Sequence, residues 1–310
     1  AKRHSVDVDI LTAWLDYIGV ATDKPAKIEN HFSTKINKSA GYDFISGWGS
    51  DATPLILANS SDQHVRVPGN MKPHGVAVHP SPTLQAAIGW RSPVAAKLRI
   101  EGKIQHAHPE CGNGVTWSVE LRRGVNRQRL ASGVAAGAKV VEIGPIDALH
   151  VLKDDVISIL VGPRDGNHSC DLTAVDLTLL SAGEGGKVWD LAADLSPDIR
   201  AGNPHADRFG NEGVWHLYTE AVTGGDPGAM VPVGSLLAQW QTAATPAEKQ
   251  MLAQAVQKLL NGEMPADKDT PDAKLYRELR ALGGPLFRSA GVKAAANSSA
   301  TNATRGQASS

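Results

Sequence analysis

Two stretches, Lys97–Ile104 with the sequence KLRIEGKI and Val115–Arg123 with the sequence VTWSVELRR, decide the fold of this chain. In both, apolar or small residues alternate with polar and charged ones, which puts the two kinds of side chain on opposite faces of a strand. The residues on the buried face are expected to be Leu98, Ile100, Gly102, Ile104, Val115, Trp117, Val119 and Leu121. Each stretch is therefore predicted to be a strand that packs on a core.

Further short strands are expected on either side of this pair, at residues 128–131, 139–143, 155–161 and 172–180, separated by turns rich in Gly, Pro, Asp and Asn. Six or more such strands predict an antiparallel β-sandwich of about 100 residues, which we place at 84–182. Helical patterns are nearly absent from this third of the chain, which argues against a Rossmann fold or an α/β-barrel enzyme.

The flanking regions differ in character. Residues 1–83 are expected to form an N-terminal helix, marked by Val8, Leu11, Trp14, Leu15 and Ile18, and an irregular extension that wraps a neighbouring domain. Residues 183–230 form a loop-rich connection, 231–288 a helical segment and 289–310 a disordered tail. The predicted fold class is mainly β: a jelly-roll-like antiparallel sandwich with C-terminal helices.

Composition excludes several classes of function. The 310 residues include 31 basic and 32 acidic side chains, a formal charge of -1, with no basic stripe. This balance argues against nucleic-acid binding. No apolar run reaches the roughly 18 residues that span a bilayer. The first residues lack both a Met and a signal-peptide core, which indicates a processed or excised chain.

Histidines and the two cysteines gather in two predicted loops, with His106, His108 and Cys111 in one and His168 and Cys170 in the other. Three interpretations stay open. Cys111 and Cys170 can form a disulfide, the histidines and thiols can hold zinc or copper, or both thiols can be free. A disulfide would fit an exported protein.

The polar loops also suggest a ligand site. Acidic turns offer oxygens for a structural Ca²⁺ ion, although they do not match an EF-hand; they contain Asp154 and Asp155, Asp165 and Asn167, and Asp171. Trp90, beside Arg91, is a candidate platform on which a sugar ring could stack. The predicted ligand-binding residues are Trp90, Arg91, His106, His108, Asp165, Asn167 and His168, and the histidines among them are the predicted metal ligands.

Catalytic signals are weak. The sequence has no G-x-S-x-G, no Walker loop, no H-E-x-x-H and no C-x-x-C-H haem motif. His205 and Asp207 are close enough in sequence to form an acid–base pair. No catalytic residue is predicted, and a metal-dependent hydrolase or polysaccharide-active enzyme remains the alternative.

Four stretches carry a resemblance to known proteins: GWRSPVAAKLRIEGKI, CGNGVTWSVELRRG, LKDDVISILVGPRDGNHSCDLTAVDLTL, and VWDLAADL with NPHADRFGNEGVWHLY. They resemble a segment of large exported proteins of planctomycete-type bacteria that often also carry a cytochrome c domain. The similarity runs from about Asn30 to Phe287. The strand pattern also looks like the galactose-binding-like jelly roll of many carbohydrate-binding modules.

These observations predict a non-catalytic, extracytoplasmic module of a larger exported protein, which binds carbohydrate or other domains of the assembly. Another alternative is a structural or redox-partner module that docks on a cytochrome c domain. Because this chain lacks the haem motif, the resemblance gives it no haem of its own.

Overall fold

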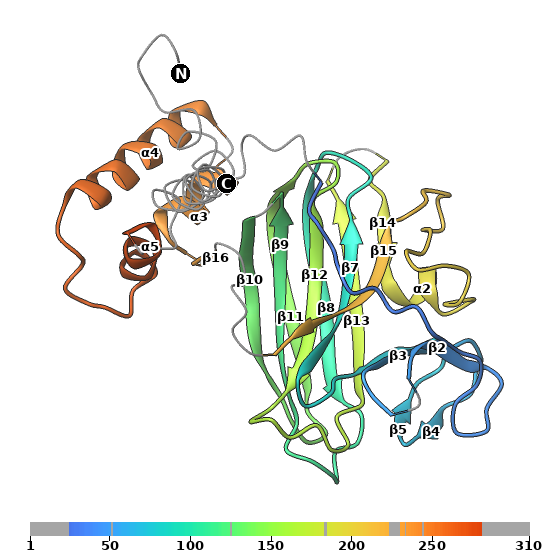
Figure 1. The fold of residues 1–310 in the computed structure, drawn as a ribbon. Coiled ribbons are helices and arrows are strands. Elements are labelled where there is room, and N and C mark those ends of the chain that lie inside the picture. The colour runs from blue at the N-terminus through green and yellow to red at the C-terminus, as the bar shows by residue number, and fades with distance from the viewer. Residues whose placement is uncertain are drawn as a thin grey trace, which may run out of the picture. The chain divides into compact units, whose positions relative to one another are not determined.

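The computed structural model describes residues 25–50, 52–124, 126–182, 185–222, 230–232, 234–243 and 245–280. The chain divides into two compact units (Figure 1). The larger unit holds the described residues of 25–123 and 129–222, and the smaller unit those of 124–128 and 230–280.

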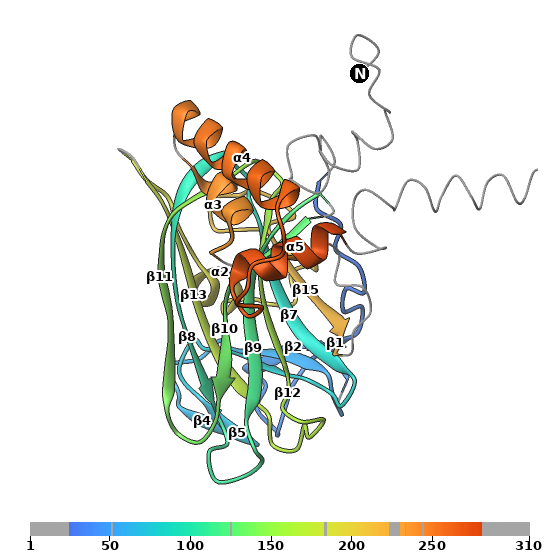
Figure 2. The ribbon, with the colours of Figure 1, turned by 90° about the vertical axis from the view of Figure 1, so that its left-hand side faces the viewer.

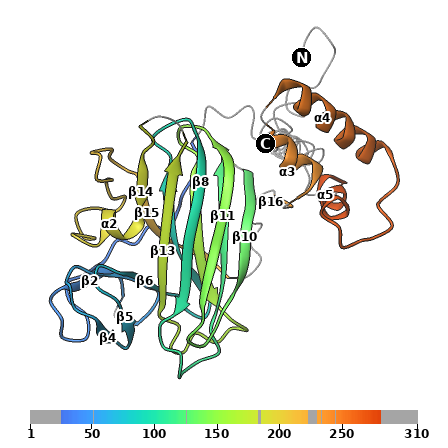
Figure 3. The ribbon, with the colours of Figure 1, turned by 180° about the vertical axis from the view of Figure 1, so that it is seen from behind.

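The larger unit is a sandwich of two β-sheets, seen from the side in Figure 2 and from behind in Figure 3. The first sheet has eight strands in the order β1-β2-β3-β6-β13-β8-β11, with β14 also paired to β13. Its strands are β1 (Lys35–Ile36), β2 (Ile45–Gly49), β3 (Leu55–Asn59), β6 (Val76–His79), β8 (Ala96–His106), β11 (Val140–Val151), β13 (Thr173–Ser181) and β14 (Val188–Asp190).

Within this unit the second sheet has the order β15-β7-β12-β9-β10. Its strands are β7 (Leu84–Arg91), β9 (Val115–Arg123), β10 (Asn126–Ala135), β12 (Val156–Pro163) and β15 (Trp215–Ala221). A separate hairpin joins β4 (Val65–Val67) to β5 (Gly69–Met71). The chain crosses between the sheets after β6, β7, β8, β10, β11, β12 and β14, as in a jelly roll.

The core lies between the sheets and follows the alternation in the sequence. Leu98, Ile100 and Ile104 of β8 are buried, whereas Arg99 and Lys103 between them are exposed. Val115, Val119 and Leu121 fill the same core from β9. A fully buried aliphatic side chain stabilises a fold by about 1.5–3 kcal/mol. The predicted mainly β, antiparallel sandwich is confirmed.

The structure differs from the irregular extension predicted before residue 84. Strands β2, β3 and β6 in this region belong to the eight-stranded sheet and continue it beyond β13. β6, with the sequence VAVH, is buried at every position, and β3 is buried at all but its first. Short strands that are covered on both faces lack the alternation that identifies a strand from sequence.

The connection after β14 is irregular and is held by tryptophans. It contains one short helix, α2 (Leu191–Leu195). Trp189 Nε1 donates to Asp207 Oδ2 over 2.8 Å, and Trp215 Nε1 donates to Asp194 Oδ2 over the same distance. Both indole rings are fully buried, so these hydrogen bonds satisfy donors that water cannot reach.

The smaller unit contains α3 (Leu236–Thr242), α4 (Pro246–Asn261) and α5 (Pro271–Arg280), which confirms the predicted C-terminal helices. Its strand β16 (Met230–Val231) pairs in parallel with Arg127 and Gln128. The Thr245 hydroxyl caps α4 by accepting from the Glu248 amide over 3.2 Å. Leu237, Leu275 and Leu279 are among the buried residues of its core.

Two predictions fall outside the described residues: the helix marked by Val8, Leu11, Trp14, Leu15 and Ile18, and the tail 289–310. Within the described ranges, no helix has both the length and the apolar character needed to cross a bilayer.

Candidate functional site

The predicted ligand-binding residues lie at opposite ends of the sandwich. Trp90 and Arg91 end β7, close to where β8 begins at Ala96, whereas His106 is the last residue of β8. At about 3.3 Å per residue, the two ends of β8 are about 33 Å apart. The loops that carry His108, Asp165, Asn167 and His168 adjoin the His106 end. The predicted set therefore does not form one site.

Trp90 is a core residue. Its side chain is 0% exposed, and its ring meets Trp189 edge-on with the ring centroids 4.9 Å apart. Along β7 it shares the buried face with Ala86 and Ile88, as the period of two requires. A sugar stacks on an exposed aromatic face, so the prediction of Trp90 as a sugar platform is wrong.

Arg91 and two histidines form a hydrogen-bonded chain at the same end. Arg91 Nε lies 3.2 Å from His216 Nε2, which also contacts the Gly213 carbonyl at 3.1 Å, and His216 Nδ1 lies 2.8 Å from His31 Nε2. Burial, with the charge of Arg91 and the neighbouring His31, lowers the pKa of His216 to about 3. Arg91 Nη2 also donates to the Ala26 carbonyl over 3.0 Å, so this guanidinium ties the 25–31 segment to the sheet.

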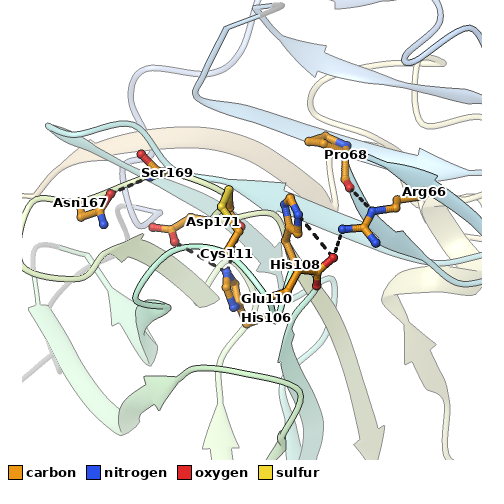
Figure 4. The surroundings of a disulfide bond; sticks show 10 residues. Arg66, Pro68, His106, His108, Glu110, Cys111, Asn167, Ser169 and Asp171 are labelled. Carbon is orange, nitrogen blue, oxygen red and sulfur yellow. Dashed lines mark hydrogen bonds and ion pairs between the residues drawn. A yellow bond between two sulfur atoms is a disulfide. The ribbon is translucent and has the colours of Figure 1, made fainter.

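At the other end, Cys111 and Cys170 are joined by a disulfide with their Cα atoms 5.7 Å apart. Of the three interpretations that the sequence left open, the structure shows the disulfide. Each cysteine lies in a tight turn: the Cys111 amide donates to the His108 carbonyl over 3.0 Å, and the Asp171 amide donates to the His168 carbonyl over 3.3 Å. The bond therefore links the β8–β9 loop to the β12–β13 loop (Figure 4).

The three histidines predicted as metal ligands do not share a centre. His106 is buried and uses Nε2 to donate to the Cys170 carbonyl over 2.9 Å, and burial lowers its pKa. His168 faces His79 instead, with ring centroids 6.3 Å apart. Within the described ranges, the atoms that could hold an ion together come from His108, Cys111 and Cys170. The predicted trio of His106, His108 and His168 is wrong because its rings serve different neighbours.

The acidic turns proposed for calcium are likewise divided. Asp155 accepts from Arg123 Nη2 over 2.6 Å, and Asn167 Oδ1 accepts from the Ser169 amide over 2.9 Å. Asp165 is exposed at a turn. Asp171 is fully buried, and burial raises its pKa to about 7. These oxygens hold local structure or are shut away from solvent, and they give no support to a calcium site.

His205 and Asp207 do not form the acid–base pair that their sequence spacing suggests. His205 Nε2 contacts the Asp198 carbonyl at 3.0 Å, while Asp207 accepts from Trp189 and from the Asn211 amide, the latter over 2.8 Å. Both side chains therefore fix the connection between β14 and β15.

A hollow that sequence reasoning missed lies on the outer face of the eight-stranded sheet. It is open, with a volume of about 450 Å³, and lies across β13, β8 and β11. Its lining residues are Glu101, Gly102, Lys103, Glu142, Ile143, Gly144, Pro145, Asp176 and Thr178, which we call the sheet groove.

The sheet groove lies where the pairing of β11 with β8 becomes irregular. Lys103 on β8 stands opposite Asp176 of β13 and Glu142 of β11. The next outward position on β11 is Gly144, at φ +85°, where the register with β8 shifts. A Cβ there would lie 2.5 Å from the Ile100 carbonyl oxygen, so the backbone conformation and the close approach both require glycine.

The carboxylates that line the sheet groove are each paired with a basic side chain. Lys103 Nζ lies 3.2 Å from Glu142 Oε1. The other two carboxylates of the groove, those of Asp176 and Glu101, each pair with a cation that does not line the groove. Asp176 is held by Lys72 at 2.6 Å, and Glu101 by Arg99 at the same distance. The sheet groove thus presents many hydrogen-bonding groups with little net charge.

No family model matches this sequence, and no curated protein matches it. One solved structure with similarity is a CBM51 module from Clostridium perfringens GH95, in complex with methyl-galactose. It is 10% identical, the match covers 51% of this chain and 94% of that chain, and the TM-score is 0.25. The sandwich is established by the strand pairings, and the resemblance to exported cytochrome-associated proteins stays a prediction.

One sequence signal could have located the groove. Gly144-Pro145 follows the strand predicted at 139–143, which made it look like a strand end. β11 instead continues through it to Val151. Glycine and proline inside a strand mark a bulge or a close backbone approach, and here they mark the groove floor.

Proposed function

We propose that the larger unit is a non-catalytic carbohydrate-binding module and that it holds a neutral glycan in the sheet groove. The observation that carries this proposal is the hollow itself, where exposed backbone at Gly144–Pro145 is surrounded by paired polar side chains. Its volume of about 450 Å³ is within the range of small-molecule sites.

The chemistry of the lining favours sugar hydroxyl groups. A hydroxyl donates and accepts at once, so it can bridge an ammonium group and a carboxylate such as Lys103 and Glu142. Both are exposed and are free to reorient toward a ligand. The exposed Pro145 ring supplies an apolar surface for the C–H groups of a sugar. Because each groove carboxylate has a cation beside it, a neutral ligand fits better than a strongly charged one.

Binding is favoured over hydrolysis. A glycosidase needs a carboxylic acid that is protonated at working pH beside a second carboxylate. The described carboxyl groups with raised pKa values, Asp155, Asp171 and Asp194, are all buried and do not line the groove. The residues nominated for a metal-dependent hydrolase also lie apart, as described above.

Affinity electrophoresis through gels that contain soluble neutral polysaccharides tests this function. We expect retardation by at least one of galactan, xylan, mannan or mixed-linkage glucan. Lys103→Ala and Glu142→Gln should each weaken binding at least tenfold, about 1.4 kcal/mol, because hydrogen bonds to charged groups contribute about 1.5–3 kcal/mol.

Lys27→Ala and Glu29→Gln are matched controls, because Lys27 and Glu29 form an exposed ion pair outside the groove. They should leave retardation unchanged. All four substitutions are at exposed positions, so the free energy of unfolding should change by no more than about 0.5 kcal/mol. Equal loss of binding in the Lys27 and Lys103 variants would refute the groove as the binding site.

We also propose that the module works outside the cytoplasm as part of a larger exported protein. The Cys111–Cys170 disulfide supports this location, because such bonds persist in oxidising compartments.

A further inference from the structure

The disulfide end of the sandwich carries a set of potential metal ligands that is distinct from the groove. The two sulfur atoms and a ring nitrogen of His108 all lie within 4.8 Å of one another. Cys111 and His108 belong to one turn, and Cys170 to the facing loop. Both cysteines are only half-buried, so a reductant can reach the bond.

We propose that reduction of this disulfide creates a zinc site formed by the Cys111 and Cys170 thiolates and the His108 imidazole. A dithiol supplies two electrons and two protons and becomes a disulfide, while the Cys111–Cys170 bond breaks to give two thiols. Zn²⁺ then binds the two sulfurs and releases both protons to the solvent. Thiolate and imidazole are the ligands that Zn²⁺ prefers in proteins.

His106 is not part of this group, whereas His108 has a ring nitrogen within 4.8 Å of both sulfurs. Nδ1 of His108 is buried and has no hydrogen-bond partner among the described residues, whereas its Nε2 lies 3.6 Å from Glu110 Oε1. Glu110 is in turn held by Arg66, which also donates to the Pro68 carbonyl over 2.9 Å (Figure 4). A carboxylate behind an imidazole orients the ring as a metal ligand.

The geometry also explains the expected coordination. Three protein ligands leave one position of a tetrahedral zinc ion for water. The ligand atoms of a tetrahedral zinc ion lie closer together than 4.8 Å. Once the two sulfurs have separated, the two loops must therefore move slightly toward each other so that all three ligand atoms reach the ion. His106 stays outside because it is not among the residues whose ligand atoms lie within 4.8 Å of one another.

The test uses the full chain, reduced with a phosphine, desalted under argon and titrated with Zn²⁺ against a chromophoric chelator. We expect one Zn²⁺ per reduced chain and none bound to the oxidised chain. Co²⁺ in place of Zn²⁺ should give a near-ultraviolet thiolate-to-cobalt absorption band. His108→Ala should weaken Zn²⁺ binding at least tenfold, whereas His168→Ala, in the facing loop, should leave it unchanged.

This pair of variants also separates the site from an unfolded chain that binds zinc through its cysteines. An unfolded chain would not distinguish His108 from His168. Equal affinities of the two variants, or equal Zn²⁺ binding by the reduced and oxidised chains, would overturn the proposal.

Discussion

His216→Gln is expected to remove a large part of the acid sensitivity of this protein. Between pH 6.5 and 3 the unfolded chain binds a proton at His216 that the folded chain does not, because burial lowers the folded pKa to about 3. The free energy of unfolding therefore decreases as the pH is lowered from 6.5 to 3, by about 5 kcal/mol from this one group. Glutamine cannot titrate, and its carbonyl oxygen can still accept from Arg91 Nε.

Guanidinium denaturation at several pH values from 7 to 3 measures the effect. As the pH falls, the unfolding free energy of the variant should decrease less than that of the wild type. His64→Gln is the control, because His64 is exposed directly before β4, and it should follow the wild type. Parallel curves for wild type and His216→Gln would show that the Arg91–His216–His31 chain does not resist protonation.

Removal of the disulfide is expected to cost about 4 kcal/mol of unfolding free energy. Cys111 and Cys170 are separated by 59 positions, and closing a loop of that length restricts the unfolded chain by about this amount. The double variant Cys111→Ala, Cys170→Ala should therefore unfold at lower guanidinium concentration without loss of the sandwich. Circular dichroism in the absence of reductant measures both.

Wild-type protein in excess reductant is the control and should unfold close to the double variant. The loss would then be attributable to the covalent link. A difference below about 1 kcal/mol between the oxidised wild type and the double variant would contradict this expectation.

Sequence periodicity predicted the parts of the fold that have one buried face. Leu98, Ile100 and Ile104 alternate with charged residues because β8 has the core on one side and solvent on the other. The strands before residue 84 escaped detection because β3 and β6 are buried on both faces. Apolar runs of four or five residues give no period that identifies a strand.

The candidate site was harder to predict, for a physical reason. Loops rich in His, Asp and Trp suggested a ligand site. However, Trp90 and Asp171 are buried, and Arg91 holds the 25–31 segment against the sheet. The sheet groove depends on which outward positions of three strands lie side by side, and on the irregular pairing of β11 at Gly144. Strand register across residues 103, 142 and 176 is long-range information that local patterns do not contain.

Amide hydrogen exchange can be measured with and without a polysaccharide that retards the protein. If the glycan lies in the sheet groove, exchange should slow in the segments 101–103, 142–144 and 176–178, which carry lining residues of the hollow. Exchange should not change at the ends of the sandwich, in residues 90–91 and 164–170. Protection confined to either of those ends, with none at 101–103, would contradict this placement of the glycan.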